Sequence, residues 1–172
     1  MIKTLAVHIK GYIKESVLTP VFMILEVIME TIIPMLMATM IDDGVVKGDF
    51  NHVLFVGLLM GLCALVALFA GYMGGVYGAK ASAGFAKNLR SDIFHKIQTY
   101  SLENIDKFSA TSLVTRMTTD VANVQFSYMM IIRIAIRAPL MLIFSIIMAY
   151  IMGGALATAF VVIIPVLAGG LI

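Results

Sequence analysis

Four long apolar stretches dominate the pattern of hydrophobic and polar positions along the chain, at residues 17–41, 53–78, 131–152 and 155–172. Each approaches or exceeds the roughly 20 residues that an α-helix needs to cross about 30 Å of hydrocarbon. The pattern predicts an all-α membrane protein, a bundle of transmembrane helices with four spans in this sequence. We expect the fourth span to be incomplete, because no polar segment follows it.

The polar segment between the second and third spans, residues 79–130, keeps the spacing of a helix. Its first half continues an apolar stripe at Phe85, Leu89, Ile93, Ile97 and Tyr100. Its second half has apolar residues in steps of three and four, the spacing of a helix packed on another helix, at Val114, Met117, Val121 and Val124. We therefore expect two long helical arms outside the membrane, joined by a short break at about residues 102–112.

The N-terminal residues 1–14 have an amphipathic pattern. Their apolar residues recur at helical spacing, at Ile2, Leu5, Ile9 and Ile13, and three lysines lie elsewhere around the helix. This pattern predicts an elbow helix in the cytoplasmic interface of the membrane. A frayed terminus is the alternative.

Lysine and arginine are distributed unevenly among the loops. Eight of the twelve lie within residues 80–137, whereas the loop of residues 42–52 carries three aspartates and one lysine. Because positive residues are retained on the cytoplasmic side, we expect the N-terminus and residues 79–130 to be cytoplasmic. The chain is thus predicted to be a multi-pass protein of the plasma (inner) membrane.

The composition excludes several classes of protein. The chain is 61% hydrophobic and 13% charged, whereas soluble domains carry roughly 25% charged residues. No nucleic-acid partner is expected, because the basic residues alternate with acidic ones and have few aromatic neighbours. The fourteen methionines are expected mostly at packing and lipid-facing positions, with an adaptable cavity wall as the alternative.

No catalytic or metal-binding motif can be assembled from the sequence. The three histidines lie in different segments, and the patterns GxxxxGK[ST], CxxC and HExxH are missing. We therefore predict no catalytic residue, no metal ligand and no cofactor in this chain, which alone should not hydrolyse ATP.

Two features of the first two spans bear on how the helices pack. Pro34 predicts a kink in the first span. The second span has glycines four residues apart, which allow close approach between helices in lipid, at Gly57/Gly61, Gly71/Gly75 and Gly74/Gly78.

Charged residues inside the apolar stretches are the candidate site. Glu26 and Glu30 lie one turn apart in the first span, and Arg133 and Arg137 repeat that spacing where the third begins. A charge in the membrane costs at least about 2.5 kcal/mol and usually faces a partner or a watery cavity. The carboxylates either line a substrate cavity that favours cationic or polar substrates, or pair with an arginine or with polar groups of other helices. They could also be protonated or snorkel without a special role, and the arginines are predicted to be snorkelling membrane-interface anchors.

Residues 108–121, FSATSLVTRMTTDV, carry the pattern Leu-x-x-Arg-x-x-x-Asp-Val after a Phe and a short polar turn. This segment resembles the first intracellular loop of ATP-binding-cassette (ABC) exporters. The preceding residues 89–94, LRSDIF, and the later Arg133-x-x-x-Arg137-Ala138-Pro139 also fit, especially the bacterial heterodimeric multidrug subgroup. The resemblance covers essentially the whole chain, and it departs from the pattern at Thr111, where many members carry Gly.

The resemblance implies a role for the break between the two arms. Residues 102–109 would form a coupling helix that docks on a nucleotide-binding domain and transmits ATP-driven motion. The residues implied in this docking are Leu102, Glu103, Ile105, Asp106, Phe108 and Ser109, with Lys107 also at the polar rim. Arg116 and Asp120 would support the loop as an i, i+4 pair.

The resemblance also implies the partners and the limits of this chain. The family's membrane domain has six spans and is followed by an ATPase domain that binds ATP and Mg²⁺, so we expect an N-terminal fragment with spans one to four. The partners would be the lipid bilayer, a nucleotide-binding domain, a second half-transporter (hetero- rather than homodimeric) and a small amphipathic substrate. Two alternatives are a transmembrane signalling module and a small four-span transporter that couples protons through Glu26 or Glu30.

Overall fold

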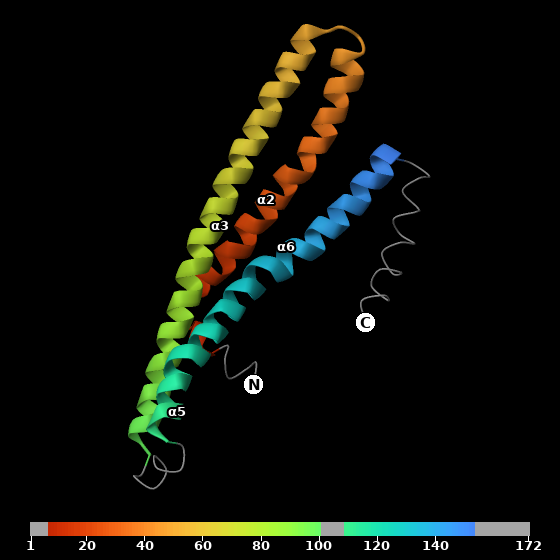
Figure 1. Cartoon of the computed structure of the whole chain (residues 1–172). Helices are drawn as coiled ribbons and strands as arrows, with labels where there is room; N and C mark the ends of the chain where they lie inside the picture. The colour runs from red at the N-terminus through yellow and green to blue at the C-terminus, as the bar shows by residue number, and fades with distance from the viewer. Residues whose placement is uncertain (1–6, 101–108, 154–172) are drawn as a thin grey trace. The chain divides into compact units, whose positions relative to one another are not determined.

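The computed structural model describes residues 7–100 and 109–153, and every regular element in these ranges is helical (Figure 1). The elements in chain order are a 3₁₀ turn η1 (Val7–Ile9), helix α2 (Ile13–Thr39), a π-helical turn η2 (Met40–Val45), helix α3 (Phe50–Gln98), helix α5 (Ala110–Thr115), a π-helical turn η3 (Arg116–Asp120) and helix α6 (Val121–Gly153). The predicted all-α fold class is confirmed.

Three helical stretches of the described residues are long and apolar enough to cross a membrane: Ile13–Val45, Phe50–Gln98 and Thr111–Ile151. They contain the first two predicted spans and residues 131–151 of the third. The fourth, at residues 155–172, lies outside the described residues. The chain divides into two compact units, one formed by Met1–Val21 with Met73–Ala135 and the other by Phe22–Tyr72 with Ile136–Ile172.

In the first unit, the distal half of α3 packs against the start of α6. Small residues and one aromatic ring form its buried face, at Ala81, Ser82, Phe85 and Ala86. The Phe85 ring stacks on Tyr128 of α6 with their centroids 4.8 Å apart. Arg90 of α3 donates its Nε–H to the carbonyl oxygen of Met117, 3.4 Å away. The two arms outside the predicted spans are therefore helices that contact each other directly.

The N-terminal segment is held on α3 rather than continuing as one helix into α2. The chain turns at Gly11, whose φ of +93° is accessible to glycine at little cost. Asn88 donates to the carbonyl oxygens of His8 and Lys10, at 2.8 and 2.9 Å. The ring of Tyr12 occupies the space that a Cβ at Gly84 would fill. Within the predicted elbow helix of residues 1–14, the described part is thus a short turn fixed by contacts with α3.

The returning arm contains a change of helical register. Leu113 and Val121 are buried, but Val114 is 60% exposed, so the expected seam through Val114 is wrong at that position. The reason is η3, in which the N–H of Val121 bonds to the carbonyl oxygen of Arg116, five residues back. Such a turn holds an extra residue, and therefore Leu113 takes the place in line with Val121 that an uninterrupted α-helix would give Val114.

In the second unit, α2 and α3 form a hairpin whose core contains Met23, Val27, Val56, Ala67 and Ala70. Phe22 of α2 meets Phe69 of α3 edge to face, with their ring centroids 6.5 Å apart. The opposite face of α3 exposes large apolar side chains, among them Leu58, Leu62, Leu65 and Leu68. Such a face is suited to lipid or to further transmembrane helices.

The turn between α2 and α3 is closed by local polar contacts. Gly48 has a φ of +70°, and the carboxylate of Asp49 caps α3 by accepting the N–H of His52 at 3.1 Å. Lys47 forms an ion pair with Asp43 one turn earlier. The hydrogen bond to Asp43, and then its negative charge, raise the pKa of the Lys47 ammonium group.

Candidate functional site: a charge cluster within the membrane helices

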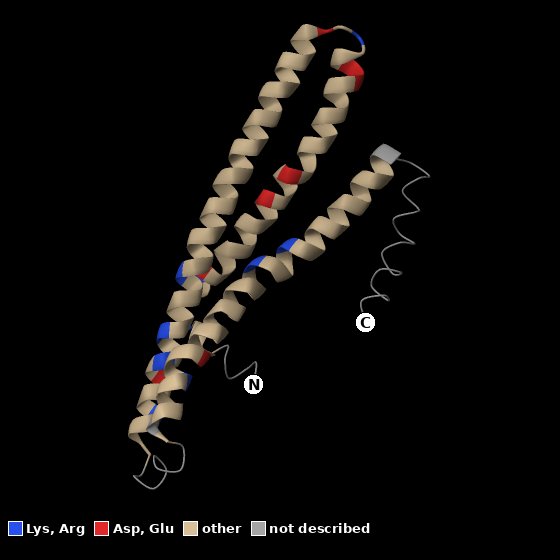
Figure 2. Ribbon diagram, viewed as in Figure 1, with Lys and Arg blue, Asp and Glu red and all other residues tan. Residues whose placement is uncertain are grey.

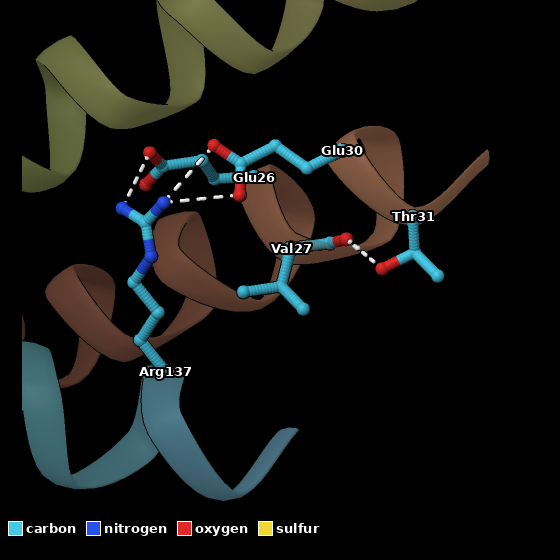
Figure 3. Close-up of polar contacts among 5 residues, drawn as sticks. All are labelled: Glu26, Val27, Glu30, Thr31 and Arg137. Atoms are coloured by element: carbon cyan, nitrogen blue, oxygen red, sulfur yellow. Dashed lines mark hydrogen bonds and ion pairs between the residues drawn. The ribbon is translucent and has the colours of Figure 1, made fainter. Parts of the chain in front are cut away.

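Arg137 of α6 binds both glutamates of α2 (Figure 3). Its Nη1 donates to Oε1 of Glu26 at 2.8 Å, and its Nη2 donates to both carboxylate oxygens of Glu30 at 3.0 Å. The planar guanidinium presents its N–H groups in a fixed fork, so one arginine can bridge two carboxylates that lie one helical turn apart. We call these three residues the charge cluster.

Gly71 of α3 provides the space for the inner carboxylate. A Cβ at Gly71 would lie 3.0 Å from Oε1 and 3.1 Å from the carboxyl carbon of Glu26. Any larger residue would crowd this group, because 3.0 Å is closer than ordinary van der Waals contact. The glycine that the sequence suggested as a helix-packing position therefore admits a charged side chain.

The charge cluster is partly shielded and carries unequal charges. The side chains of Glu26, Glu30 and Arg137 are 12%, 33% and 34% exposed. Two carboxylates and one guanidinium give a formal charge of −1 when all three are ionised. Oε2 of Glu26 is buried and has no hydrogen-bond partner within the described part of the chain. The cluster thus engages both terminal nitrogens of Arg137 and, with all three groups ionised, has one negative charge in excess.

A cavity of about 400 Å³ lies beside Glu30, between α2 and α6 of the second unit. Its wall combines one carboxylate, two hydroxyl-bearing residues and apolar side chains, from Glu30, Thr31, Pro34, Met141, Ser145, Met148 and Ala149. The Thr31 hydroxyl donates its proton to the carbonyl oxygen of Val27 at 2.7 Å (Figure 3), so it can offer a ligand only its acceptor lone pairs. The cavity can therefore receive an apolar molecule with one polar or charged group directed at Glu30.

The two arginines occupy different surroundings. Figure 2 shows acidic residues within α2 and basic residues within α6, in otherwise uncharged stretches. The side-chain carbons of Arg133 pack in the first unit beside Gly78, where an added Cβ would lie 3.4 Å from its Cδ and from Cγ2 of Thr19. Nε of Arg133 is buried without a hydrogen-bond partner among the described residues. Of the two arginines, Arg137 is thus the one that the structure brings to Glu26 and Glu30.

Most of the residues assigned to the coupling helix lie outside the described residues: Leu102, Glu103, Ile105, Asp106, Lys107 and Phe108. Ser109 is described and exposed. It caps α5 by accepting the N–H of Ser112 at 3.3 Å. Arg116 and Asp120 are the first and last residues of η3, and both are exposed.

The described residues contain no group of three or more His, Cys, Asp or Glu side chains placed to hold a metal ion. Within the charge cluster, both carboxylates bond to the guanidinium of Arg137. What the arrangement can do chemically is bind: it offers a negative group beside an apolar cavity.

Several cavity residues were not singled out by the sequence analysis. Ser145, Ala149 and Thr31 carry no pattern that separates them from other residues of apolar helices. For Met141 and Met148, the only signal was the large number of methionines in the chain, and a role in a cavity wall was the less favoured interpretation. Gly71 was noted, but for helix packing. The spacing of glutamates and arginines was the one pattern that pointed to this place.

Comparison with known proteins identifies the class. Residues 17–170 match the ABC transporter transmembrane region family. The chain therefore belongs to this family, and it is a membrane-spanning part of an ABC transporter.

Individual relatives agree with this assignment. An ABC transporter ATP-binding protein of Bacillus subtilis is 33% identical over 159 residues, which cover 92% of this chain and 28% of the relative. ABC transporter ATP-binding proteins of Mycobacterium bovis and Mycobacterium tuberculosis are each 34% identical over 163 residues, covering 94% of this chain and 28% of theirs. The chain thus spans about 28% of the length of these relatives.

Proposed function

We propose that the chain is the permease part of an ATP-driven exporter of amphipathic compounds. In this proposal the membrane helices form part of the substrate path, and residues 102–109 are the coupling helix that binds a nucleotide-binding domain. That domain would bind ATP and Mg²⁺ and would hydrolyse ATP. A second half-transporter, different from this one, would complete the substrate path.

The length of α3 is the observation that carries the proposal. The helix has 49 residues, whereas about 20 suffice to cross the hydrocarbon. Its distal half is packed against the N-terminal segment through Asn88, against α6 through Phe85 and against η3 through Arg90. A helix that continues this far as a supported arm can transmit motion from its tip to the membrane segments. Neither a signalling module nor a compact proton-coupled transporter is favoured by a specific observation of this kind.

The distribution of charge supports the orientation in this proposal. Lys and Arg gather on the part of α3 nearest α5 (Figure 2), and positive residues remain on the cytoplasmic side of membranes. The N-terminus and the tip of the arms would then face the nucleotide-binding domain in the cytoplasm. Lys47, in the turn between α2 and α3, would face outside.

Photo-cross-linking from single cysteines tests both the orientation and the docking. A Cys63→Ala background carries either Ser109→Cys at the tip or Lys47→Cys in the turn, each labelled with a benzophenone maleimide. We expect illumination to join the nucleotide-binding domain to position 109 and not to position 47. An adduct from position 47, or none from position 109 in a transporter that binds ATP, would contradict the proposal.

A further inference from the structure

We infer that the cavity beside Glu30 binds a monovalent organic cation with an apolar body, and that Glu30 is its counter-ion. This inference rests on the proposed export function, for which it names the substrate class. Its observations are the surplus charge of the charge cluster, the exposure of Glu30 and the composition of the cavity wall.

The charge cluster does not balance its own charge when all three groups are ionised. Glu26, Glu30 and Arg137 then have one negative charge in excess, and no other Lys or Arg pairs with either glutamate within residues 7–100 and 109–153. An unbalanced charge in a membrane segment is costly. A cation in the adjoining cavity would restore neutrality, and so would a proton on one carboxylate. A cluster neutralised by a bound cation should prefer cations to anions, whereas a cluster neutralised by a proton should not.

The two glutamates differ in how accessible they are from the cavity. Glu26 is 12% exposed and lies against Gly71, whereas Glu30 is 33% exposed and lines the cavity. Arg137 reaches Glu30 with Nη2 alone. Each carboxylate oxygen has two lone pairs, so Glu30 can face a ligand cation while it stays bound to Arg137. Glu26 holds the arginine in place, and Glu30 is the group that a ligand would meet.

The other residues that line the cavity also suit an apolar cation. Pro34 lines the cavity one turn after Glu30 and has no N–H to donate to the carbonyl oxygen of Glu30. The carbonyl oxygen of Glu30 therefore lacks its usual α-helical donor on the turn that carries the carboxylate. Across the cavity, Met141 and Met148 of α6 offer polarisable, adaptable surface for an apolar body. The volume of about 400 Å³ lies within the range of roughly 300–1,000 Å³ typical of small-molecule sites.

Equilibrium binding of tetraphenylphosphonium tests the inference directly. The probe is titrated into the transporter in lipid nanodiscs without nucleotide, and tetraphenylborate, of similar shape and opposite charge, is titrated in parallel. We expect the cation to bind more tightly than the anion. Glu30→Gln should raise the Kd for the cation at least about tenfold, Glu30→Asp should raise it less, and neither should weaken binding of the anion.

Glu15→Gln is the matched control, because it removes the same charge from the first turn of the same helix, at a residue that does not line the cavity. It should leave the Kd for the cation unchanged. Ser145→Phe, which fills the cavity without touching a charge, should abolish binding of the cation and keeps the test decisive if Glu30→Gln does not fold.

The inference is overturned if Glu30→Gln binds the cation as tightly as Glu15→Gln does, or if the unaltered transporter binds both ions equally, as a proton-neutralised cluster would. Binding is measured without ATP, so its outcome does not depend on export. Failure of the export function would appear separately, as no ATP-dependent transport of any amphipathic compound by a transporter that still binds the cation.

Discussion

At the scale of single residues, Arg137 joins two carboxylates of one helix and leaves one of their charges unbalanced. An arginine near a membrane surface usually extends its side chain so that the guanidinium reaches water. Arg137 has instead both terminal nitrogens on Glu26 and Glu30 at 2.8 to 3.0 Å. Because these charged groups are in contact and partly shielded from solvent, their contributions to the free energy of unfolding should be coupled. A double-mutant cycle can measure that coupling.

We predict that Glu26→Gln and Arg137→Gln are not additive. Each change alone leaves a charge without its partner, so the double variant should be more stable than the sum of the single effects implies, by about 1–2 kcal/mol. The measurement is the free energy of unfolding from denaturant titration in mixed micelles. Glu26→Gln with Arg133→Gln is the control cycle, and its coupling should be near zero. Equal coupling in both cycles would refute the pairing.

Gly71 gives the second prediction at this scale. Alanine is favoured over glycine in a helix by about 0.5–1 kcal/mol, and the control Gly61→Ala should show this gain, because nothing lies within 4 Å of a Cβ there. Gly71→Ala should instead destabilise the protein by about 1–2 kcal/mol, since its methyl group would press on the Glu26 carboxylate. Melting temperatures of the two purified variants provide the check. A gain in both would mean that Gly71 serves no such role.

The sequence indicated the glutamates but not their partner. Their one-turn spacing places both on one face of a helix, which can be read without a structure. The sequence left the choice between Arg133 and Arg137 open, because both share one face of a helix and only the packing of α2 and α6 within the second unit places Arg137 on the glutamates. Gly71 belongs to a pattern that is common in membrane helices, so its contact with Glu26 could not have been predicted.

At the scale of elements, the N-terminal segment and the distal half of α3 form one packed structure. His8 pairs with Asp92, its Nε2 lying 2.9 Å from Oδ2. Tyr128 and Ser16 are joined by a hydrogen bond of 2.7 Å. Because the Ser16 hydroxyl also donates its proton to the carbonyl oxygen of Tyr12, Tyr128 is the donor in that bond. Motion of the arm would therefore carry the N-terminal segment with it.

Asn88→Ala tests how this segment is held. The side chain supplies two hydrogen bonds to the carbonyls of His8 and Lys10, and their loss should free residues 7–12 locally. We expect limited trypsin digestion after Lys10 to become at least about tenfold faster, with little change in melting temperature. Asn123→Ala, at an exposed position of α6, is the matched control. Digestion of both variants at one rate would show that Asn88 does not hold the segment.

Element types followed from the sequence more reliably than their details. The length of the apolar stretches and the continued stripe beyond Lys80 predicted long helices, because helical periodicity survives the change from lipid to water. The register of the returning arm did not follow. Val114 has the spacing of a buried residue in an ideal α-helix, and one π-helical turn exchanges its role with that of Leu113.

At the scale of the whole molecule, the chain is a membrane part of an ABC transporter that spans about 28% of the length of its relatives. Family membership supplies what no single residue of the chain could, namely its place in an ABC transporter, and it supports the proposal of a nucleotide-binding partner. The chain itself contributes a long helical arm and a charge cluster beside a cavity. In the proposed function, ATP-driven motion would reach the chain at the far end of the arm and would change the site where a substrate contacts Glu30.

Transport by the assembled transporter in proteoliposomes is the most direct test of this division of labour, whether permease and ATPase share one polypeptide or not. We predict that Ile105→Ala with Phe108→Ala at the tip retains basal ATP hydrolysis but lowers ATP-driven uptake of an amphipathic compound at least about fivefold, as expected when coupling between two sites is lost. Val114→Ala, at an exposed position of the same arm, should transport normally. Equal uptake by the tip variant and this control, or uptake by this chain driven by a proton gradient without ATP, would contradict a coupled permease.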